Sequence, residues 1–122
     1  MLRLGITVLG VNDIERATEF WSAALGVTTS SEWDYPDWRT LSDERGPVLG
    51  LMHSETPVQQ HPRVHLDLFV DSRSEQDAEV ARLVGLGATK VDWELYPEDP
   101  DFVVLADPEG NIFCVVDLSH AQ

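Results

Sequence analysis

The sequence has little cysteine, few basic residues and no long hydrophobic run. Its 122 residues include one cysteine, Cys114, which excludes an internal disulfide and fits a reducing compartment. No apolar stretch approaches the roughly 20 residues of a membrane helix, and residues 1–6 do not lead into the apolar core and cleavage site of a signal peptide. We therefore expect a cytoplasmic protein with no membrane partner.

Basic residues are scarce relative to acidic ones. Lys and Arg number 8 against 22 Asp and Glu, which gives a formal net charge of −14. Because nucleic acids and anionic membrane surfaces bind basic patches, we expect neither as a partner. The simplest interpretation of the acidity is solubility through self-repulsion or a high-salt host. The 43% hydrophobic content is typical of a globular chain, and the length fits one domain that needs no metal or disulfide to hold its core.

The chain contains the same pattern twice. Residues 38–49 and 102–113 align so that Leu, Asp and Gly coincide, and each segment predicts two strands joined by a turn. The acids of Asp107-Pro108-Glu109-Gly110 are interpreted as turn chemistry. Residues 6–11 and 64–70 alternate as strands do, and a helical pattern follows each of them.

The two helical patterns carry start and stop signals. Asp13 is the expected N-cap of the first helix, and Gly26 its end. Its apolar face is expected to comprise Ile14, Ala17, Trp21, Ala24 and Leu25. In the second helix Ser74 with Asp77 resembles a capping box, and Gly87 ends the pattern. The expected apolar stripe of this helix comprises Val80, Leu83 and Val84.

An aromatic, acidic stretch lies between helix and hairpin in each half, at residues 32–35 and 92–96. Each stretch is predicted to hold the remaining strand, so that the unit is β-α-β-β-β. The sequence therefore predicts an α+β chain of two tandem βαβββ modules. Module one spans residues 1–55, a Pro-containing linker spans 56–62, and module two spans 63–122.

Four segments resemble a known family. They are residues 20–26 (FWSAALG), 63–68 (RVHLDL), 86–89 (LGAT) and 104–115 (VLADPEGNIFCV). In this order they resemble the glyoxalase-like domain of the glyoxalase/bleomycin-resistance/extradiol-dioxygenase (vicinal oxygen chelate) superfamily. The resemblance implies curled mixed sheets around a cleft with helices outside, a small-molecule ligand or substrate, and pairing into a homodimer.

Metal-using members of this superfamily hold their ion at four positions. The resemblance places these positions at Ile6, Gly50, His65 and Cys114, and the first two offer no donor atom. A catalytic divalent site needs about three protein ligands, and an extradiol iron site needs two His and a carboxylate. Asp67 lies roughly 7 Å along the strand from His65, so we expect it to reach an ion only through distortion. No metal or other cofactor is therefore expected, with a divalent metal as the minor alternative.

Strand alternation predicts a small-molecule site that is apolar and aromatic with few polar groups. His65, Asp67 and Phe69 share the face opposite the helix. The family resemblance implies that Cys114 of the last strand faces the same side. Hydrophobic walls with scarce polar groups are typical of ligand pockets. The candidate ligand-binding residues are Trp38, Thr40, Met52, His65, Asp67, Phe69, Trp93, Phe102 and Cys114.

His65 and Asp67 are the candidate catalytic pair. A histidine titrates near neutral pH, and Asp67 could orient it or act as the base. Cys114 is a nucleophile only if His65 lowers its pKa, and otherwise an inert buried thiol. His61 and His120 are expected to be solvated, as are the loop acids Glu94, Glu98, Asp99 and Asp101.

Three functions stay open at this stage. The first is a metal-independent binder that resembles the drug-sequestering members of the superfamily. The second is a lyase, isomerase or dioxygenase, dependent on a metal or using His65 and Asp67 for acid–base chemistry. The third is an interaction module without a ligand.

Overall fold

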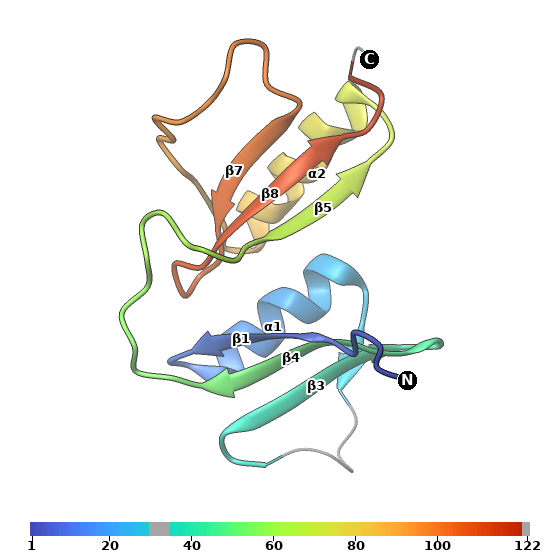
Figure 1. Ribbon diagram of the computed structural model, residues 1–122, viewed down its shortest axis with the longest axis vertical. Helices are drawn as coiled ribbons and strands as arrows, with labels where there is room; N and C mark the ends of the chain where they lie inside the picture. The colour runs from blue at the N-terminus through green and yellow to red at the C-terminus, as the bar shows by residue number, and fades with distance from the viewer. Residues whose placement is uncertain (30–34, 121–122) are drawn as a thin grey trace. The chain divides into compact units, whose positions relative to one another are not determined.

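The chain folds into two compact units. A computed structural model describes residues 1–29 and 35–120. The units are Met1–Pro57 and Val58–Gln122 (Figure 1). From here on, module one and module two mean these two units, which share the predicted linker residues 56–62 between them. No helix within the described ranges is long and apolar enough to cross a membrane.

Module one is a helix on a four-stranded sheet. Its elements are β1 (Thr7–Val11), α1 (Ile14–Leu25), β2 (Thr28–Thr29), β3 (Trp38–Asp43) and β4 (Gly46–His53). The strand order is β1-β4-β3-β2, with β4 parallel to β1 and antiparallel to β3.

Module two repeats this arrangement. Its elements are β5 (Leu66–Val70), α2 (Arg73–Leu86), β6 (Thr89–Lys90), β7 (Phe102–Ala106) and β8 (Ile112–Asp117). The strand order β5-β8-β7-β6 matches that of module one, and β8 is parallel to β5 and antiparallel to β7. The predicted α+β fold of two tandem βαβββ modules is confirmed.

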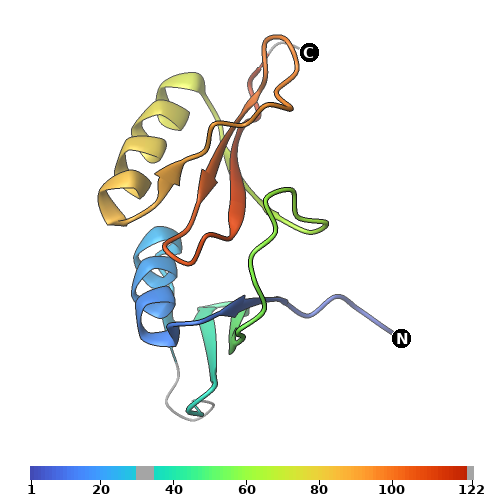
Figure 2. The same ribbon diagram turned by 90° about the vertical axis from the view of Figure 1, so that its left-hand side faces the viewer.

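Each helix lies along one face of its own sheet (Figure 2). In module one α1 buries Ile14, Ala17, Phe20 and Trp21, and the rings of Phe20 and Trp21 meet edge to face at 5.1 Å. Phe20 was not among the expected core residues. The N-cap Asp13 accepts a hydrogen bond from the Arg16 amide, and Gly26 ends the helix at φ 66°, as predicted.

The start of α2 differs from the prediction. Its N-cap is Ser72 rather than Ser74, and the Ser72 hydroxyl accepts from the Glu75 amide at 3.1 Å. The longer Glu75 carboxylate reaches back to the Asp71 amide, which Asp77 could not do from the predicted register. Val84 is 43% exposed, and the buried α2 residue missed by the pattern is Gln76.

The short outer strand of module two is also displaced from its predicted position. It is β6, directly after α2, and residues 92–96 form a loop. The Val91 amide still donates to the Val104 carbonyl, but the chain then leaves the sheet. The Tyr96 hydroxyl accepts a hydrogen bond from the Val104 amide at 2.7 Å. A side chain therefore takes the place of a neighbouring strand at this point of β7. In module one, residues 32–34 of the corresponding prediction lie outside the described residues.

Candidate functional site

Strands β5 and β8 position the polar centre of module two. Their parallel pairing places Asp67 opposite Cys114. Leu66, Leu68 and Val70 are less exposed than the residues between them, so His65 and Asp67 lie on the face away from α2, as predicted. The repeat is also visible in register, because Val8 stands opposite Gly50 in module one.

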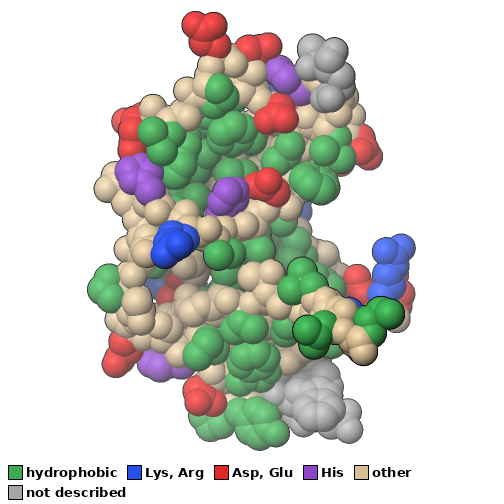
Figure 3. Space-filling model, viewed as in Figure 1, with side chains coloured by type: hydrophobic (Ala, Val, Ile, Leu, Met, Phe, Trp, Pro, Cys, Tyr) green, Lys and Arg blue, Asp and Glu red, His purple; other side chains and the backbone are tan. Residues whose placement is uncertain are grey.

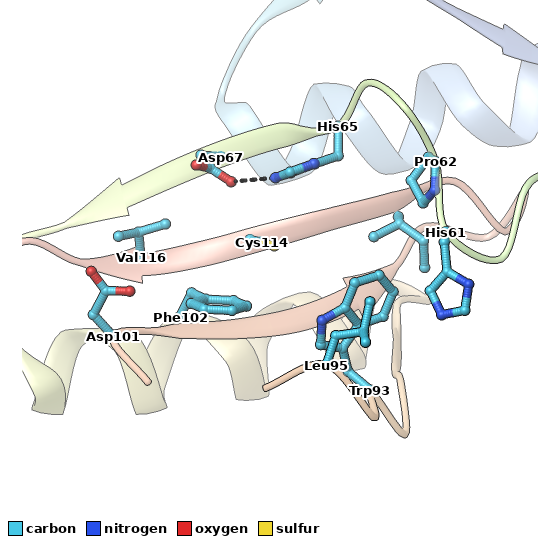
Figure 4. A pocket seen from close by; sticks show the side chains of 11 residues that line it. His61, Pro62, His65, Asp67, Trp93, Leu95, Asp101, Phe102, Cys114 and Val116 are labelled. Carbon is cyan, nitrogen blue, oxygen red and sulfur yellow. Dashed lines mark ion pairs between the residues drawn. The ribbon is translucent and has the colours of Figure 1, made fainter. Parts of the chain in front are cut away.

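This face of module two is hollowed into a pocket of about 400 Å³ (Figure 4). Figure 3 shows hydrophobic side chains gathered over module two, with histidine and carboxylate side chains beside them. The lining residues are His61, Pro62, His65, Asp67, Trp93, Leu95, Asp101, Phe102, Ile112, Cys114 and Val116. All of them belong to module two.

His65 and Asp67 point toward each other above the strand that carries Cys114 (Figure 4). His65 Nε2 lies 3.0 Å from Asp67 Oδ1, and both side chains are about half exposed. One donor atom from each of His65, Asp67 and Cys114 lies within 4.8 Å of the others. The side chains of His65 and Asp67 therefore approach each other more closely than the spacing along the strand suggests. The strand repeat separates the backbones, whereas the side chains lean together.

The Cys114 thiol is protonated at neutral pH. Burial raises its pKa to about 11, and the negative charge and hydrogen bond of Asp67 act in the same direction. Because the thiolate is the reactive form, free Cys114 is a poor nucleophile under these conditions.

His61 lines the pocket, although the sequence placed it in a solvated linker, and Glu94 lies beside it without lining the pocket. His61 forms an ion pair with Glu94, and its ring meets Trp93 at 5.2 Å. A backbone hydrogen bond and the contact with His61 hold the pKa of Glu94 below its usual value. The aromatic, acidic composition of residues 92–96 could have pointed to this part of the wall. Trp93 and Leu95 of that segment line the pocket.

Phe102 forms part of the apolar floor. Its ring lies 5.3 Å from that of Tyr96, whose hydroxyl is fixed to the sheet. Asp101 lines the end of the pocket away from Trp93 (Figure 4). Its backbone carbonyl accepts a hydrogen bond from the buried amide of Gln76.

The structure brings together five of the nine candidate ligand-binding residues. They are His65, Asp67, Trp93, Phe102 and Cys114. Phe69 follows on the same strand but is 65% exposed and does not line the pocket. Trp38, Thr40 and Met52 belong to module one, where the Trp38 indole donates to the Thr40 hydroxyl at 2.8 Å.

The module-one positions implied by the resemblance cannot hold a metal. A Cβ on Gly50 would lie 2.8 Å from the Trp38 ring and 3.0 Å from the Ile6 side chain. Carbon therefore fills the space where a donor from position 50 would project, and Ile6 supplies none. The four-position metal site of the superfamily does not fit this chain.

Comparison with known proteins agrees with the architecture. The profile of the family described as the glyoxalase-like domain matches residues 6–116. No curated protein sequence matches the chain.

Solved structures share the fold at low identity. A solution NMR structure of a protein from Agrobacterium tumefaciens is 22% identical with a TM-score of 0.76, and the match covers 100% of both chains. A glyoxalase/bleomycin resistance protein/dioxygenase family enzyme from Burkholderia phytofirmans PsJN is 20% identical with a TM-score of 0.72, covering 93% of this chain and 96% of that one. The fosfomycin resistance protein FosX from Listeria monocytogenes is 13% identical with a TM-score of 0.71, covering 100% and 95%. At these identities the likeness establishes the fold alone.

Proposed function

Because the chain belongs to the glyoxalase-like domain family, we propose that it binds a small molecule in the pocket of module two. The ligand is aromatic or drug-like, and neutral or cationic. The observation that carries this proposal is the pocket itself, which joins aromatic and aliphatic walls to a small polar group centred on His65 and Asp67. Its volume lies within the ordinary range for ligand sites.

The aromatic side chains suit a planar ligand. Trp93 and Phe102 line the pocket from two different segments of module two. Each is held by another ring, Trp93 by His61 and Phe102 by Tyr96. Aromatic side chains give large contact areas and favourable stacked or edge-on geometries.

The charge of the lining sets the ligand's charge. Among the described residues that line the pocket, Asp67 and Asp101 are acidic and none is Lys or Arg. The net charge of −14 adds to this local field. A phosphorylated or polycarboxylate ligand is therefore disfavoured.

Isothermal calorimetry with a matched pair of probes tests the proposal. We expect 1-naphthylmethylamine to bind and 1-naphthoate to bind at least tenfold more weakly. Trp93→Ala should weaken amine binding, whereas Tyr35→Ala, an exposed aromatic of module one, should not. Equal affinity for both probes, or equal loss in both variants, would contradict the proposal.

A second candidate function is catalysis by a lyase, isomerase or dioxygenase. The 3.0 Å contact between His65 and Asp67 favours it, because a carboxylate orients an imidazole for proton transfer. A turnover screen of thiol conjugates and catechols tests this candidate. His65→Gln should abolish any turnover found while the protein stays folded. Unchanged turnover would exclude His65 as the acid or base.

Pairing into a homodimer is the third part of the proposal. Val8, Val48 and Met52 are exposed on the sheet face of module one that α1 does not cover, and a second copy could bury them. Light scattering after size-exclusion chromatography should give twice the chain mass, and Met52→Glu should shift it toward one chain. A monomeric wild-type protein would contradict this part.

A further inference from the structure

We propose that His65, Asp67 and Cys114 form a metal site confined to module two, which takes a borderline-soft divalent cation of the Zn²⁺ type. This site replaces the four-position site that the chain cannot build, because Ile6 and Gly50 supply no donors. It does not depend on the proposed organic ligand.

The donor set selects the kind of cation. An imidazole nitrogen, a carboxylate oxygen and a thiol sulfur converge at one place. Mg²⁺ and Ca²⁺ prefer oxygen ligands alone, whereas Zn²⁺ and Co²⁺ accept nitrogen, oxygen and sulfur together. Three protein ligands with a fourth position open are typical of zinc sites that also bind a water or a substrate.

The distances fit a tetrahedral ion after a small movement. Bonds of about 2.0–2.3 Å place neighbouring donors roughly 3.3–3.8 Å apart. The three donor atoms here lie within 4.8 Å of one another, and the His65–Asp67 pair is at 3.0 Å. Side-chain rotations that move donors by about 1 Å would close the set around one cation.

Burial differs among the three proposed ligands. Cys114 is held within the sheet, whereas His65 and Asp67 have room to rotate. Cys114 is 5% exposed on β8, between β5 and β7, and Asp67 is its register partner on β5. His65 and Asp67 are about half exposed and face the pocket. The open coordination position would therefore face the pocket.

Charge supports the assignment. Asp67 and a coordinated Cys114 thiolate contribute two negative charges that a divalent cation neutralises. Coordination breaks the Cys114 S–H bond and forms a metal–sulfur bond, and the proton passes to solvent. His65 coordinates in its neutral form.

Titration with Co²⁺ tests the site in full-length, reduced protein first stripped with a chelator. Thiolate coordination to Co²⁺ produces a ligand-to-metal charge-transfer absorption, which carboxylates alone do not give. We expect one equivalent of Co²⁺ to produce this band and Zn²⁺ to abolish it by displacement.

Variants separate the site from binding to other carboxylates of this acidic chain. Cys114→Ala should lose the band, and His65→Gln and Asp67→Asn should weaken binding by more than about 100-fold, beyond the loss typical of outer-shell partners. The matched control is His120→Gln, since His120 faces Asp99 at 3.2 Å in a His–Asp pair outside the cluster. This control should keep the band. Circular dichroism verifies that each variant is folded.

Two results would overturn the proposal. One is the absence of the charge-transfer band at saturating Co²⁺, and the other is equal Co²⁺ affinity in the wild type and the folded Asp67→Asn variant. Binding of 1-naphthylmethylamine is measured separately with chelator present. Failure of the metal site and failure of the organic ligand site are therefore distinguishable.

Discussion

Asp67 interacts with the side chains of both His65 and Cys114. It contacts His65 at 3.0 Å and hydrogen-bonds the Cys114 thiol. Strand alternation predicted that His65 and Asp67 share a face, and the family resemblance placed Cys114 on it. Neither carries information on how far side chains lean along a strand. The position of His61 was missed for a related reason, because its place in the wall depends on a loop that returns from residues 92–96.

The thiol of Cys114 should react slowly in metal-free protein. With a pKa of about 11, about one molecule in a thousand carries the thiolate at pH 8, so alkylation by iodoacetamide should be roughly a hundredfold slower than for a free cysteine. The rate should rise with pH up to about 11. Asp67→Asn should accelerate alkylation by removing a charge that raises the pKa, and an unchanged or slower rate would contradict this assignment.

Gly50 of module one has no room for a larger side chain. Gly50→Ala would force a methyl group against the Trp38 ring, which its bond to Thr40 holds in place. We expect a loss of about 1–3 kcal/mol in the free energy of unfolding, measured in urea. Gly5→Ala, where nothing lies within 4 Å, is the control. Equal stability of the two variants would show that the indole yields freely.

At the scale of elements, the helices and hairpins were predictable and the outer strand was not. Helix ends carry local signals, and the buried Asp107 carboxylate accepts from the amides of Glu109 and Asn111 to close the β7–β8 turn. A two-residue strand such as β6 has no periodicity to detect. Beyond β6, the Tyr96 hydroxyl accepts a hydrogen bond from the Val104 amide of β7, and no strand periodicity predicts such a side-chain contact.

The N-terminus of α2 gives a direct test of the corrected register. Ser72→Ala should cost about 0.5–2 kcal/mol of unfolding free energy, because the Glu75 amide loses its acceptor. Ser74→Ala should cost much less, since among the described residues its hydroxyl meets that of Ser72 and is not the N-cap acceptor. Urea denaturation measures both. A larger loss in Ser74→Ala would restore the register predicted from sequence.

The end of β8 contributes stability that depends on pH. Hydrogen bonds from Ser119 lower the pKa of Asp117. A lowered pKa means that the stabilisation is complete above the ordinary aspartate pKa of about 4 and is lost as the pH falls through the lower folded value. Asp117→Asn should therefore reduce Tm at pH 7, and the difference from the wild type should shrink below pH 4. A difference independent of pH would contradict this account.

At the scale of the whole molecule, the two modules share a fold but differ in the side chains at matching positions. Val8 and Gly50 occupy in module one the register of Asp67 and Cys114 in module two. The fold of both modules followed from the repeat and from the family resemblance. The polar groups of module two could be predicted from the sequence, residue by residue. The pocket could not, because part of its wall is formed by the loop at residues 91–101.

We propose that module two alone forms the ligand site. The most direct test of this claim is an ¹H–¹⁵N NMR titration of the intact protein with 1-naphthylmethylamine in the presence of chelator. We expect saturable chemical-shift changes in the amides of β5, β7, β8 and residues 91–101, centred on Asp67, Trp93 and Phe102. Shifts confined to module one, at Trp38, Thr40 and Met52, or no saturable shifts at all, would contradict it.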